Sequence, residues 1–260
     1  MLSGLRVADG LRVLVTAGAS GIGRAIVEAM LEAGARVHIC DVDDTAIAAF
    51  RAAHPQVGVS RADVADEAAV DALFADVKAG LGGLDVLVNN AGIAGPTGNI
   101  EDIDPADWRR CIDVDLTGQF LCARRAVPML KANGSGVIIN LSSAAGRLGY
   151  AFRTPYAAAK WGVIGLTQSL ARELGPFNIS VNAVLPGIVA GPRIDRVIAA
   201  RATQMGISHA EMEKQYLDKV SMRTKVTAED VAASVVYLCS PLGRRVSGQS
   251  LGVCGNVETI

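Results

Sequence analysis

Residues 12–23 read Arg-Val-Leu-Val-Thr-Ala-Gly-Ala-Ser-Gly-Ile-Gly, an apolar run that leads directly into a glycine-rich turn. The stretch that follows, Arg24–Leu31, has the apolar spacing of a helix. Glycine at Gly21 and Gly23 lets the backbone approach a pyrophosphate, whose charge is met by N–H groups at the start of the helix. The stretch therefore predicts a dinucleotide site, although an ordinary tight turn remains an alternative for these residues taken alone.

Apolar β-branched runs alternate with Ala-rich segments of helical period along the rest of the chain. The predicted strands are Arg12–Val15, Arg36–Asp41, Val57–Ser60, Leu84–Val88, Gly136–Leu141, Ile179–Leu185 and Ser250–Val253. Apolar strands separated by helices predict a parallel sheet covered on both faces. No polar linker or repeat divides the chain, so we expect one α/β domain over residues 1–260, a doubly wound Rossmann-type sheet.

Composition excludes several classes of partner. Half of the 260 residues are hydrophobic and the formal net charge is -1, so no overall field attracts nucleic acid or anionic lipid. No apolar run approaches the roughly 20 residues of a membrane helix, and we expect a cytoplasmic protein without a membrane partner. The five cysteines are scattered and are interpreted as buried free thiols. The three histidines form no ligand cluster, so no metal site is expected.

Asp41 closes the second predicted strand about 20 residues after the glycine turn, where a carboxylate accepts hydrogen bonds from both hydroxyls of an adenosine ribose. Val42, Asp43 and Asp44 follow, and none of them neutralises a 2′-phosphate. The spacing therefore favours NAD over NADP. Arg24 is the one nearby residue that could weaken this preference.

Tyr156 and Lys160 lie four residues apart in a segment that is predicted to be helical through Glu173, so they share one helix face. A phenol is a poor acid or base near neutral pH, and a nearby ammonium favours its ionised form. Such a phenol exchanges a proton with an alcohol or alkoxide while hydride moves to or from a nicotinamide. Ser143 follows the predicted strand Gly136–Leu141 and is expected to polarise the substrate oxygen.

At this point the chain resembles the short-chain dehydrogenase/reductase family over nearly its whole length. The resemblance implies seven parallel strands, a homotetramer, an alcohol or ketone substrate, and a lysine that also binds nicotinamide ribose. It places catalytic roles on Ser143, Tyr156 and Lys160. It implies cofactor contacts at Thr16, Gly18, Ser20, Gly21, Ile22, Gly23, Asp63, Val64, Asn90, Ala91, Gly92, Tyr156, Lys160, Pro186, Gly187 and Ile188.

The chain departs from the family pattern in four places, one of which, Cys254 with Asn256, is interpreted as variation in a structural turn. Ala17 stands in place of the first glycine of the turn, and we expect Gly18 to absorb the strain. Asp115 stands in place of a catalytic Asn that helps to hold a water on the lysine in a proton relay. We expect the relay to survive with Asp115 as the fourth catalytic residue, although a carboxylate has no donor. Gly191 replaces a Thr that binds the nicotinamide carboxamide in the family.

Residues 190–222, after the sixth predicted strand, form one polar, irregular segment. Gly191 and Pro192 break the chain there, and the next helix is predicted to start at Thr227, with Asp230 in its first turn. An insertion beyond the carboxyl end of a strand is where an open α/β fold keeps a substrate lid. We therefore predict that 190–222 is the lid.

Several arginines are expected near the mouth of the site: Arg147, Arg153, Arg193, Arg196 and Arg201. A guanidinium can clamp an anionic substrate group. Arg153, three residues before Tyr156, is the best candidate, and Arg193 in the lid is the second. The competing interpretation, that the lid arginines are solvated or pair with Glu211, Glu213 or Asp195, is favoured by the sequence alone.

Three functions are compatible with these residues. The first is an NAD-dependent dehydrogenase of a small hydroxy compound such as a polyol, a sugar derivative or a hydroxy acid. The second is a 3-oxoacyl-thioester reductase that acts on acyl carrier protein, against which the acidic residues after the second strand argue. The third is a nucleotide-sensing binding protein, which has no physical need for a phenol and an amine placed together.

Overall fold

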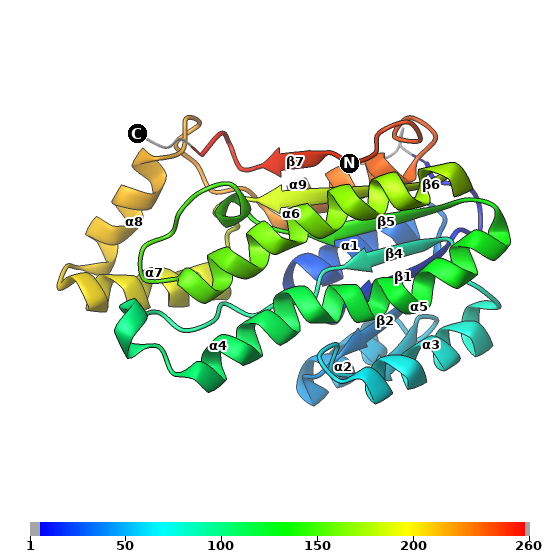
Figure 1. Ribbon diagram of the computed structural model, residues 1–260, viewed down its shortest axis with the longest axis horizontal. Helices are drawn as coiled ribbons and strands as arrows, with labels where there is room; N and C mark the ends of the chain where they lie inside the picture. The colour runs from blue at the N-terminus through cyan, green and yellow to red at the C-terminus, as the bar shows by residue number, and fades with distance from the viewer. Residues whose placement is uncertain (1–5, 258–260) are drawn as a thin grey trace.

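The computed structural model describes residues 6–257, and within that range the strands form one sheet of seven (Figure 1). The strands are β1 (Arg12–Thr16), β2 (Arg36–Asp41), β3 (Gly58–Arg61), β4 (Val86–Asn89), β5 (Gly136–Leu141), β6 (Ile179–Pro186) and β7 (Ser250–Val253). All neighbours pair in parallel, in the order β3-β2-β1-β4-β5-β6-β7. The winding reverses between β1 and β4, and ligands bind beside such a reversal, at the carboxyl ends of the strands.

The predicted strands are confirmed: three have the predicted bounds, and the bounds of the other four differ by one or two residues. The third strand begins at Gly58 instead of Val57. Val57 donates its N–H to the carbonyl of His54 at 3.0 Å, in the turn that follows α2 (Asp44–Ala53). A backbone N–H engaged in that turn is not available to the sheet, which explains the shift.

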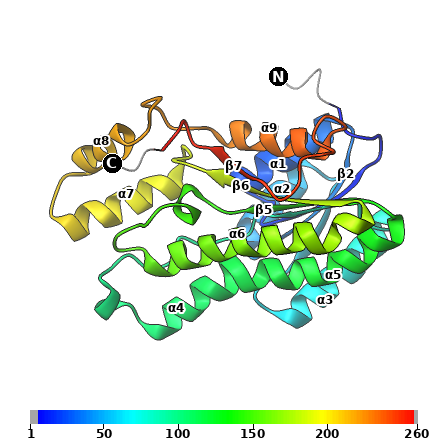
Figure 2. The same cartoon turned by 45° about the horizontal axis from the view of Figure 1, so that its top comes forward.

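Helices cover both faces of the sheet (Figure 2). They include α1 (Gly21–Glu32), α3 (Glu67–Leu81), α4 (Pro105–Ile112), α5 (Gly118–Asn133), α6 (Thr154–Leu174) and α9 (Ala228–Cys239). Successive side chains of a strand point to opposite faces, so Val13 and Val15 of β1 pack with α1, α2 and α9. Leu14 between them packs with α3, α5 and α6 on the other side. The core is thus two apolar layers, one on each face of the sheet.

Residues 190–222 are more regular than their sequence suggests. They contain α7 (Pro192–Met205) and α8 (His209–Asp218), which project beyond the sheet at the left of Figure 1. The two helices have a small apolar cluster of their own, which includes Ile198, Met212 and Tyr216. The predicted helix start at Thr227 is confirmed, because the side chains of Thr227 and Asp230 each accept the other's backbone N–H.

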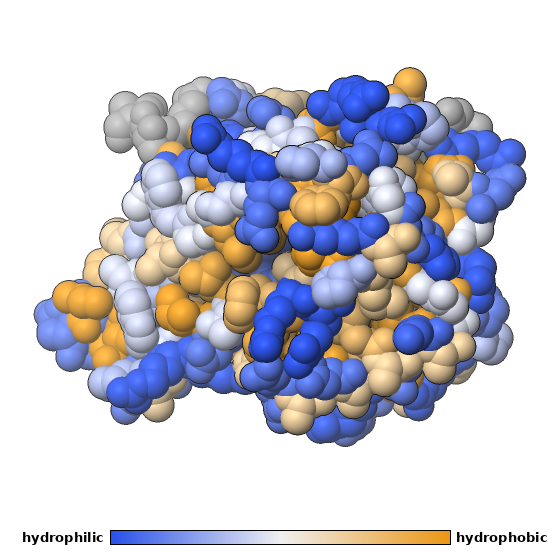
Figure 3. Space-filling view, turned by 45° about the vertical axis from the view of Figure 1, so that its right-hand side comes forward, coloured by the Kyte–Doolittle hydropathy of each residue, from blue (hydrophilic) through white to orange (hydrophobic). Residues whose placement is uncertain are grey.

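On the face in Figure 3, apolar side chains are interspersed with hydrophilic ones.

Between residues 6 and 257, the helices are all too short or too polar to cross a lipid bilayer.

His38 of β2 is a buried core side chain and is 5% exposed. Its Nε2 lies 2.9 Å from the hydroxyl of Ser60, which in turn donates to the carboxylate of Asp76 at 2.6 Å. Burial lowers the pKa of His38 below its ordinary value of 6.5, against a smaller opposing effect of the Asp76 charge. The folded protein therefore holds this imidazole neutral.

We predict that acid destabilises the fold through His38. Below about pH 6.5 the unfolded chain binds a proton that the folded chain excludes, so the free energy of unfolding falls as the pH is lowered, by up to about 1.4 kcal/mol per pH unit. His38→Gln removes this contribution, and urea denaturation between about pH 8 and pH 5 should show a shallower slope. His209→Gln, at an exposed position, is the control and should keep the full slope. Equal slopes for His38→Gln and the wild type would contradict the assignment.

Candidate active site

A cavity of about 610 Å³ opens at the carboxyl ends of the strands, beside the reversal between β1 and β4. It brings together most of the residues that were predicted from the sequence. Those that line it are Ser20, Gly21, Ile22, Gly23, Asp41, Asp63, Val64, Asn90, Ala91, Gly92, Ser143, Arg153, Tyr156, Lys160, Pro186, Gly187, Ile188 and Arg193. Thr16, Gly18 and Asp115 do not line it. Thr16 lies behind the wall, where its hydroxyl accepts the N–H groups of Asn90 and Ala91.

The glycine turn at the start of α1 lines the cavity and has no side-chain cap. The side chain of Ser20, at the N-cap position, makes no capping hydrogen bond, and the first turn of α1 carries no acidic residue. Its N–H groups therefore remain available to an anion. A Cβ on Gly23 would stand 2.0 Å from the carbonyl oxygen of Ala17, so only glycine permits this close approach of turn and helix.

The expectation that Gly18 absorbs the strain of the turn is wrong. Ala17 itself adopts the left-handed conformation, with φ of 50°, whereas Gly18 stays outside that region. This conformation costs an alanine roughly 1–2 kcal/mol. The amide of Asn90 donates to the carbonyls of both Thr16 and Ala17 at 3.0 Å, and these hydrogen bonds stabilise the strained peptide from the neighbouring strand.

Asp41 presents a fixed carboxylate at one end of the cavity. It accepts backbone N–H groups from Ala19, Val42 and Asp43 at 2.8 to 3.2 Å. Asp43 caps α2, and Asp44 pairs with Arg61 at 3.0 Å.

Two basic residues near this acidic end have partners of their own. Arg24 pairs with Glu28 and does not line the cavity, so it does not oppose the acidic character of this end. Arg110 pairs with Asp63 at 2.7 Å.

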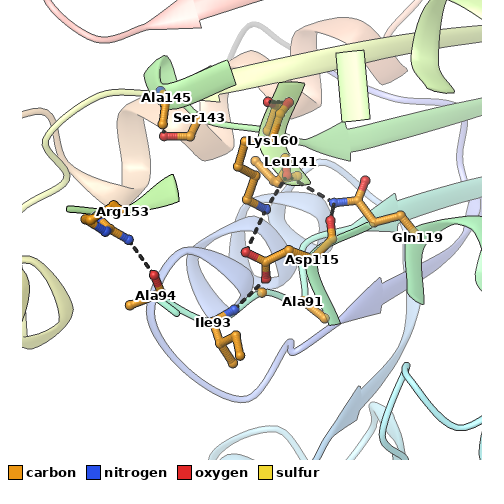
Figure 4. A network of polar contacts seen from close by, with 12 residues as sticks. Ala91, Ile93, Ala94, Asp115, Gln119, Leu141, Ser143, Ala145, Arg153 and Lys160 are labelled. Atoms are coloured by element: carbon orange, nitrogen blue, oxygen red, sulfur yellow. Dashed lines mark hydrogen bonds and ion pairs between the residues drawn. The ribbon is translucent and has the colours of Figure 1, made fainter. Parts of the chain in front are cut away.

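Tyr156 and Lys160 occupy successive turns of α6, at the other end of the cavity. The ammonium of Lys160 lies 5.6 Å from the centre of the Tyr156 ring and donates to the carbonyl of Leu141 at 3.1 Å. Lys160 is only 3% exposed. Ser143 follows β5, and its hydroxyl accepts the N–H of Ala145 at 3.1 Å (Figure 4). A hydroxyl, a phenol and a buried ammonium thus line one end of the cavity.

Asp115 is fully buried beside this group, in a π-helical turn (Asp113–Thr117) between α4 and α5. Such turns occur often at functional sites. One carboxylate oxygen accepts the N–H of Ile93 at 2.7 Å, and the other lies 3.9 Å from the ammonium of Lys160 (Figure 4). Asp115 therefore balances the lysine charge and anchors the loop after β4.

The arginines near the site divide into two groups. Arg153, Arg193 and Arg196 line the cavity. Arg147 donates to the carbonyl of Ser250, and Arg201 lies over the ring of Tyr216, so neither of these two belongs to the cavity wall.

The acidic residues that were considered as partners of the lid arginines have other partners. Glu211 caps α8, and Asp195 and Glu213 pair with Lys225.

Four of the five cysteines are buried, as expected, and Cys254 is partly exposed. Burial raises the pKa of Cys40, Cys111 and Cys239 to about 12, so these thiols stay protonated near neutral pH. Over residues 6–257, no three His, Cys, Asp or Glu side chains are grouped to hold a metal ion.

Comparison with known proteins identifies the family. The family model described as enoyl-(acyl carrier protein) reductase matches residues 16–256. A relative from Sinomonas cyclohexanicum, named cis-4-hydroxycyclohexanecarboxylate dehydrogenase, is 40% identical over 252 residues, which are 95% of this chain and 96% of that protein. The chain belongs to the short-chain dehydrogenase/reductase family.

The names of two further proteins similar to this short-chain dehydrogenase/reductase include a cofactor. The 2-dehydro-3-deoxy-L-rhamnonate dehydrogenase (NAD(+)) of Sphingomonas sp. (strain SKA58) is 34% identical over 227 residues, 87% of each chain. The crystal structure of an NAD+-bound xylitol dehydrogenase superposes with a TM-score of 0.91 and 26% identity, covering 95% of this chain and 98% of that one.

Some cavity residues of this short-chain dehydrogenase/reductase were not predicted. Tyr150, Ile194, Val197 and Tyr216 line the wall between α6 and the two helices of residues 190–222. Ile194 and Val197, three residues apart, carry a helical signal that could have placed them on one face of α7. Tyr216 comes from a separate helix, and no local pattern links it to the site.

Gly191, which replaces the threonine of the family, is the N-cap residue of α7. Its φ of 138° and ψ of 175° are accessible essentially to glycine alone.

Proposed function

We propose that the protein is an NAD-dependent dehydrogenase that interconverts a secondary alcohol and a ketone on a small hydroxy compound. The observation that carries this proposal is a single cavity with the glycine turn and Asp41 at one end, and Tyr156 with Lys160 at the other. Relatives that are named as dehydrogenases of hydroxy compounds support it.

NAD fits the residues at the acidic end. The uncapped turn before α1 receives the pyrophosphate, and Asp41 binds the ribose hydroxyls while repelling a 2′-phosphate. Asp63, Val64, Asn90, Ala91 and Gly92 form the wall that leads toward the reactive end. When bound there, the nicotinamide ring accepts hydride from the alcohol carbon or returns it to the ketone carbon.

The protein's own residues handle the proton. Tyr156 takes the hydroxyl proton as the alcohol becomes a ketone, and returns it in the reverse reaction. Lys160 lies 5.6 Å from the Tyr156 ring, and its positive charge stabilises the negative charge that the phenol oxygen carries during proton transfer. Ser143 donates a hydrogen bond to the substrate oxygen.

We predict that Tyr156→Phe abolishes most turnover. Loss of the proton-transfer group should lower kcat by about 10²- to 10⁴-fold while NADH still binds. The measurement is absorbance of the reduced nicotinamide with a panel of alcohols and ketones that includes an acetoacetyl thioester, and binding is followed by NADH fluorescence. Tyr237→Phe, at an exposed position of α9, is the matched control and should behave as wild type. Undiminished turnover by Tyr156→Phe would refute the mechanism.

Asp115 is a positioning residue in this proposal, because it acts through Lys160. Its negative charge, 3.9 Å from the ammonium, offsets part of the positive field that Lys160 exerts at Tyr156. The same carboxylate holds the N–H of Ile93 and so places the loop that carries Gly92 in the cavity wall.

Asp115→Asn should therefore move the acidic limb of the pH profile for alcohol oxidation to lower pH, because it removes a negative charge 3.9 Å from the ammonium that faces the Tyr156 ring. Asp113→Asn, at an exposed position of the same turn, is the control and should leave the profile in place. A merely structural role for Asp115 would change kcat without moving the limb.

We predict that Asp41→Asn weakens NADH binding by about 10-fold, because charge-assisted hydrogen bonds to the ribose are lost. NADPH binding should tighten in the same variant, since the repulsion of the 2′-phosphate is removed. Titration of both cofactors measures the ratio. Asp44→Asn, whose carboxylate pairs with Arg61 outside the cavity, is the control. An unchanged preference for NADH over NADPH would show that Asp41 does not bind the ribose hydroxyls.

Further features of the proposal follow from the sequence. We propose one domain over residues 1–260, with 190–222 as the lid. The contact of Arg193 with the carbonyl of Gly92, at 3.0 Å, supports the lid because it joins α7 to the loop after β4. The homotetramer and the cytoplasmic location stay predictions. The thioester-reductase alternative is supported by a relative from Streptomyces violaceoruber, 36% identical over 250 residues, that is named granaticin polyketide synthase putative ketoacyl reductase 1. The substrate panel separates it from the dehydrogenase.

A further inference from the structure

Arg153 is a buried cation without a carboxylate partner. It lines the cavity yet is only 6% exposed, and no ion pair joins it to an Asp or Glu anywhere in residues 6–257. One Nη donates to the carbonyl of Ala94 at 2.7 Å (Figure 4), while its Nε–H finds no acceptor among those residues. A buried charge is costly unless it is paired. Within the described residues, Arg153 therefore lacks both an acceptor for its Nε–H and a negative partner for its charge.

The surroundings of Arg153 add further positive charge. Arg193 donates to the carbonyl of Gly92, two residues before the Ala94 carbonyl that Arg153 contacts, so both guanidiniums lie along one loop of the cavity wall. Arg196 of α7 and Lys160 are the other two cations of this end, and Asp115 is the carboxylate paired with Lys160. The acidic residues that line the cavity, Asp41, Asp43 and Asp63, come from the ends of β2 and β3 instead.

The remaining wall at this end is apolar. Ile188, Ile194 and Val197 line it together with the rings of Tyr150 and Tyr216. Burial raises the pKa of Tyr150 to about 12, so this ring presents a neutral hydroxyl. Such a wall accommodates a hydrocarbon body, and the cations beside it accommodate one negative group.

We propose that Arg153 binds a carboxylate of the substrate, so that the enzyme acts on hydroxy acids whose hydroxyl-bearing part is apolar. This inference rests on the proposed function, because it assumes that the hydroxyl reacts at Tyr156. The guanidinium lies 4.3 Å from the centre of the Tyr156 ring, so a carboxylate held by it lies within a few bonds of the reacting carbon. Pairing supplies the missing countercharge, and the planar fork of the guanidinium fixes the orientation of the acid.

The competing role for Arg153 is to act on Tyr156 through the stacked contact of guanidinium and ring. The two roles differ in what they discriminate. A carboxylate site distinguishes an acid from a neutral substrate of the same shape, whereas an effect on the phenol changes the turnover of both substrates equally.

The first experiment measures binding and needs no turnover. Cyclohexanecarboxylate and cyclohexanecarboxamide are titrated by calorimetry into the protein loaded with NADH. We expect the carboxylate to bind the wild type about 10- to 100-fold more tightly than the amide, as charge-assisted hydrogen bonds imply. Arg153→Gln keeps a donor for the Ala94 carbonyl but removes the charge, and should abolish the difference. Arg153→Lys should retain part of it, and Arg172→Leu, at an exposed position of α6, all of it.

The second experiment compares kcat/KM for 4-hydroxycyclohexanecarboxylate, as separate cis and trans isomers, with that for the corresponding carboxamides. We expect Arg153→Gln to lower kcat/KM for the acid by about 10- to 100-fold, mainly through KM, and to leave the amide within about 3-fold. Equal losses on acid and amide would overturn the proposal in favour of an effect on Tyr156. If Arg153→Gln weakened the binding of NADH and left the binding of the carboxylate unchanged, the proposal would be overturned and Arg153 would be a cofactor contact.

These outcomes separate the inference from the proposed function. Charge-dependent binding without any turnover would support the carboxylate site and refute the dehydrogenase. Turnover of acid and amide alike, with no change in their ratio in Arg153→Gln, would support the dehydrogenase and refute the carboxylate site.

Discussion

The buried pair of Asp115 and Lys160 is the interaction on which the geometry of the site depends. Asp115 is inaccessible to solvent and Lys160 nearly so, and either charge alone would cost several kcal/mol in that position. Their 3.9 Å separation therefore constrains α6 and the π-helical turn to remain together. Because Asp115 also accepts the N–H of Ile93, the loop after β4 is fixed to the same pair. Arg153 and Arg193 donate hydrogen bonds to carbonyls of that loop. The position of the wall on the substrate side therefore depends on the carboxylate of Asp115.

The parts of the fold that could be predicted from the sequence are those set by short-range patterns. Apolar runs identified the strands because both faces of the sheet are covered, as the two apolar layers around Leu14 and its neighbours show. Tyr156 and Lys160 could be paired because helix geometry alone places residues four apart on one face. Asp41 could be placed because it ends the strand next to β1, where parallel register brings both strand ends to one edge.

The parts that could not be predicted depend on contacts between distant segments. Ala17 takes up the strain of its turn because Asn90, more than seventy residues later, holds the two carbonyls beside it. No local pattern in residues 147–201 shows which arginines face the cavity. That is decided by the Ala94 and Gly92 carbonyls for Arg153 and Arg193, and by the Ser250 carbonyl for Arg147. The helices α7 and α8 were missed because their apolar residues pack mainly on each other, which leaves a mostly polar sequence.

Gly191 sets the direction in which α7 leaves the sheet. Its backbone angles cannot be adopted by a β-branched residue, so a threonine at this position would redirect the chain at the first turn of α7 and displace Arg193, two residues later. The contact of Arg193 with the Gly92 carbonyl thus depends on the absence of a side chain at position 191. The shape of the wall on the substrate side is in this sense determined by a residue that contributes only backbone to it.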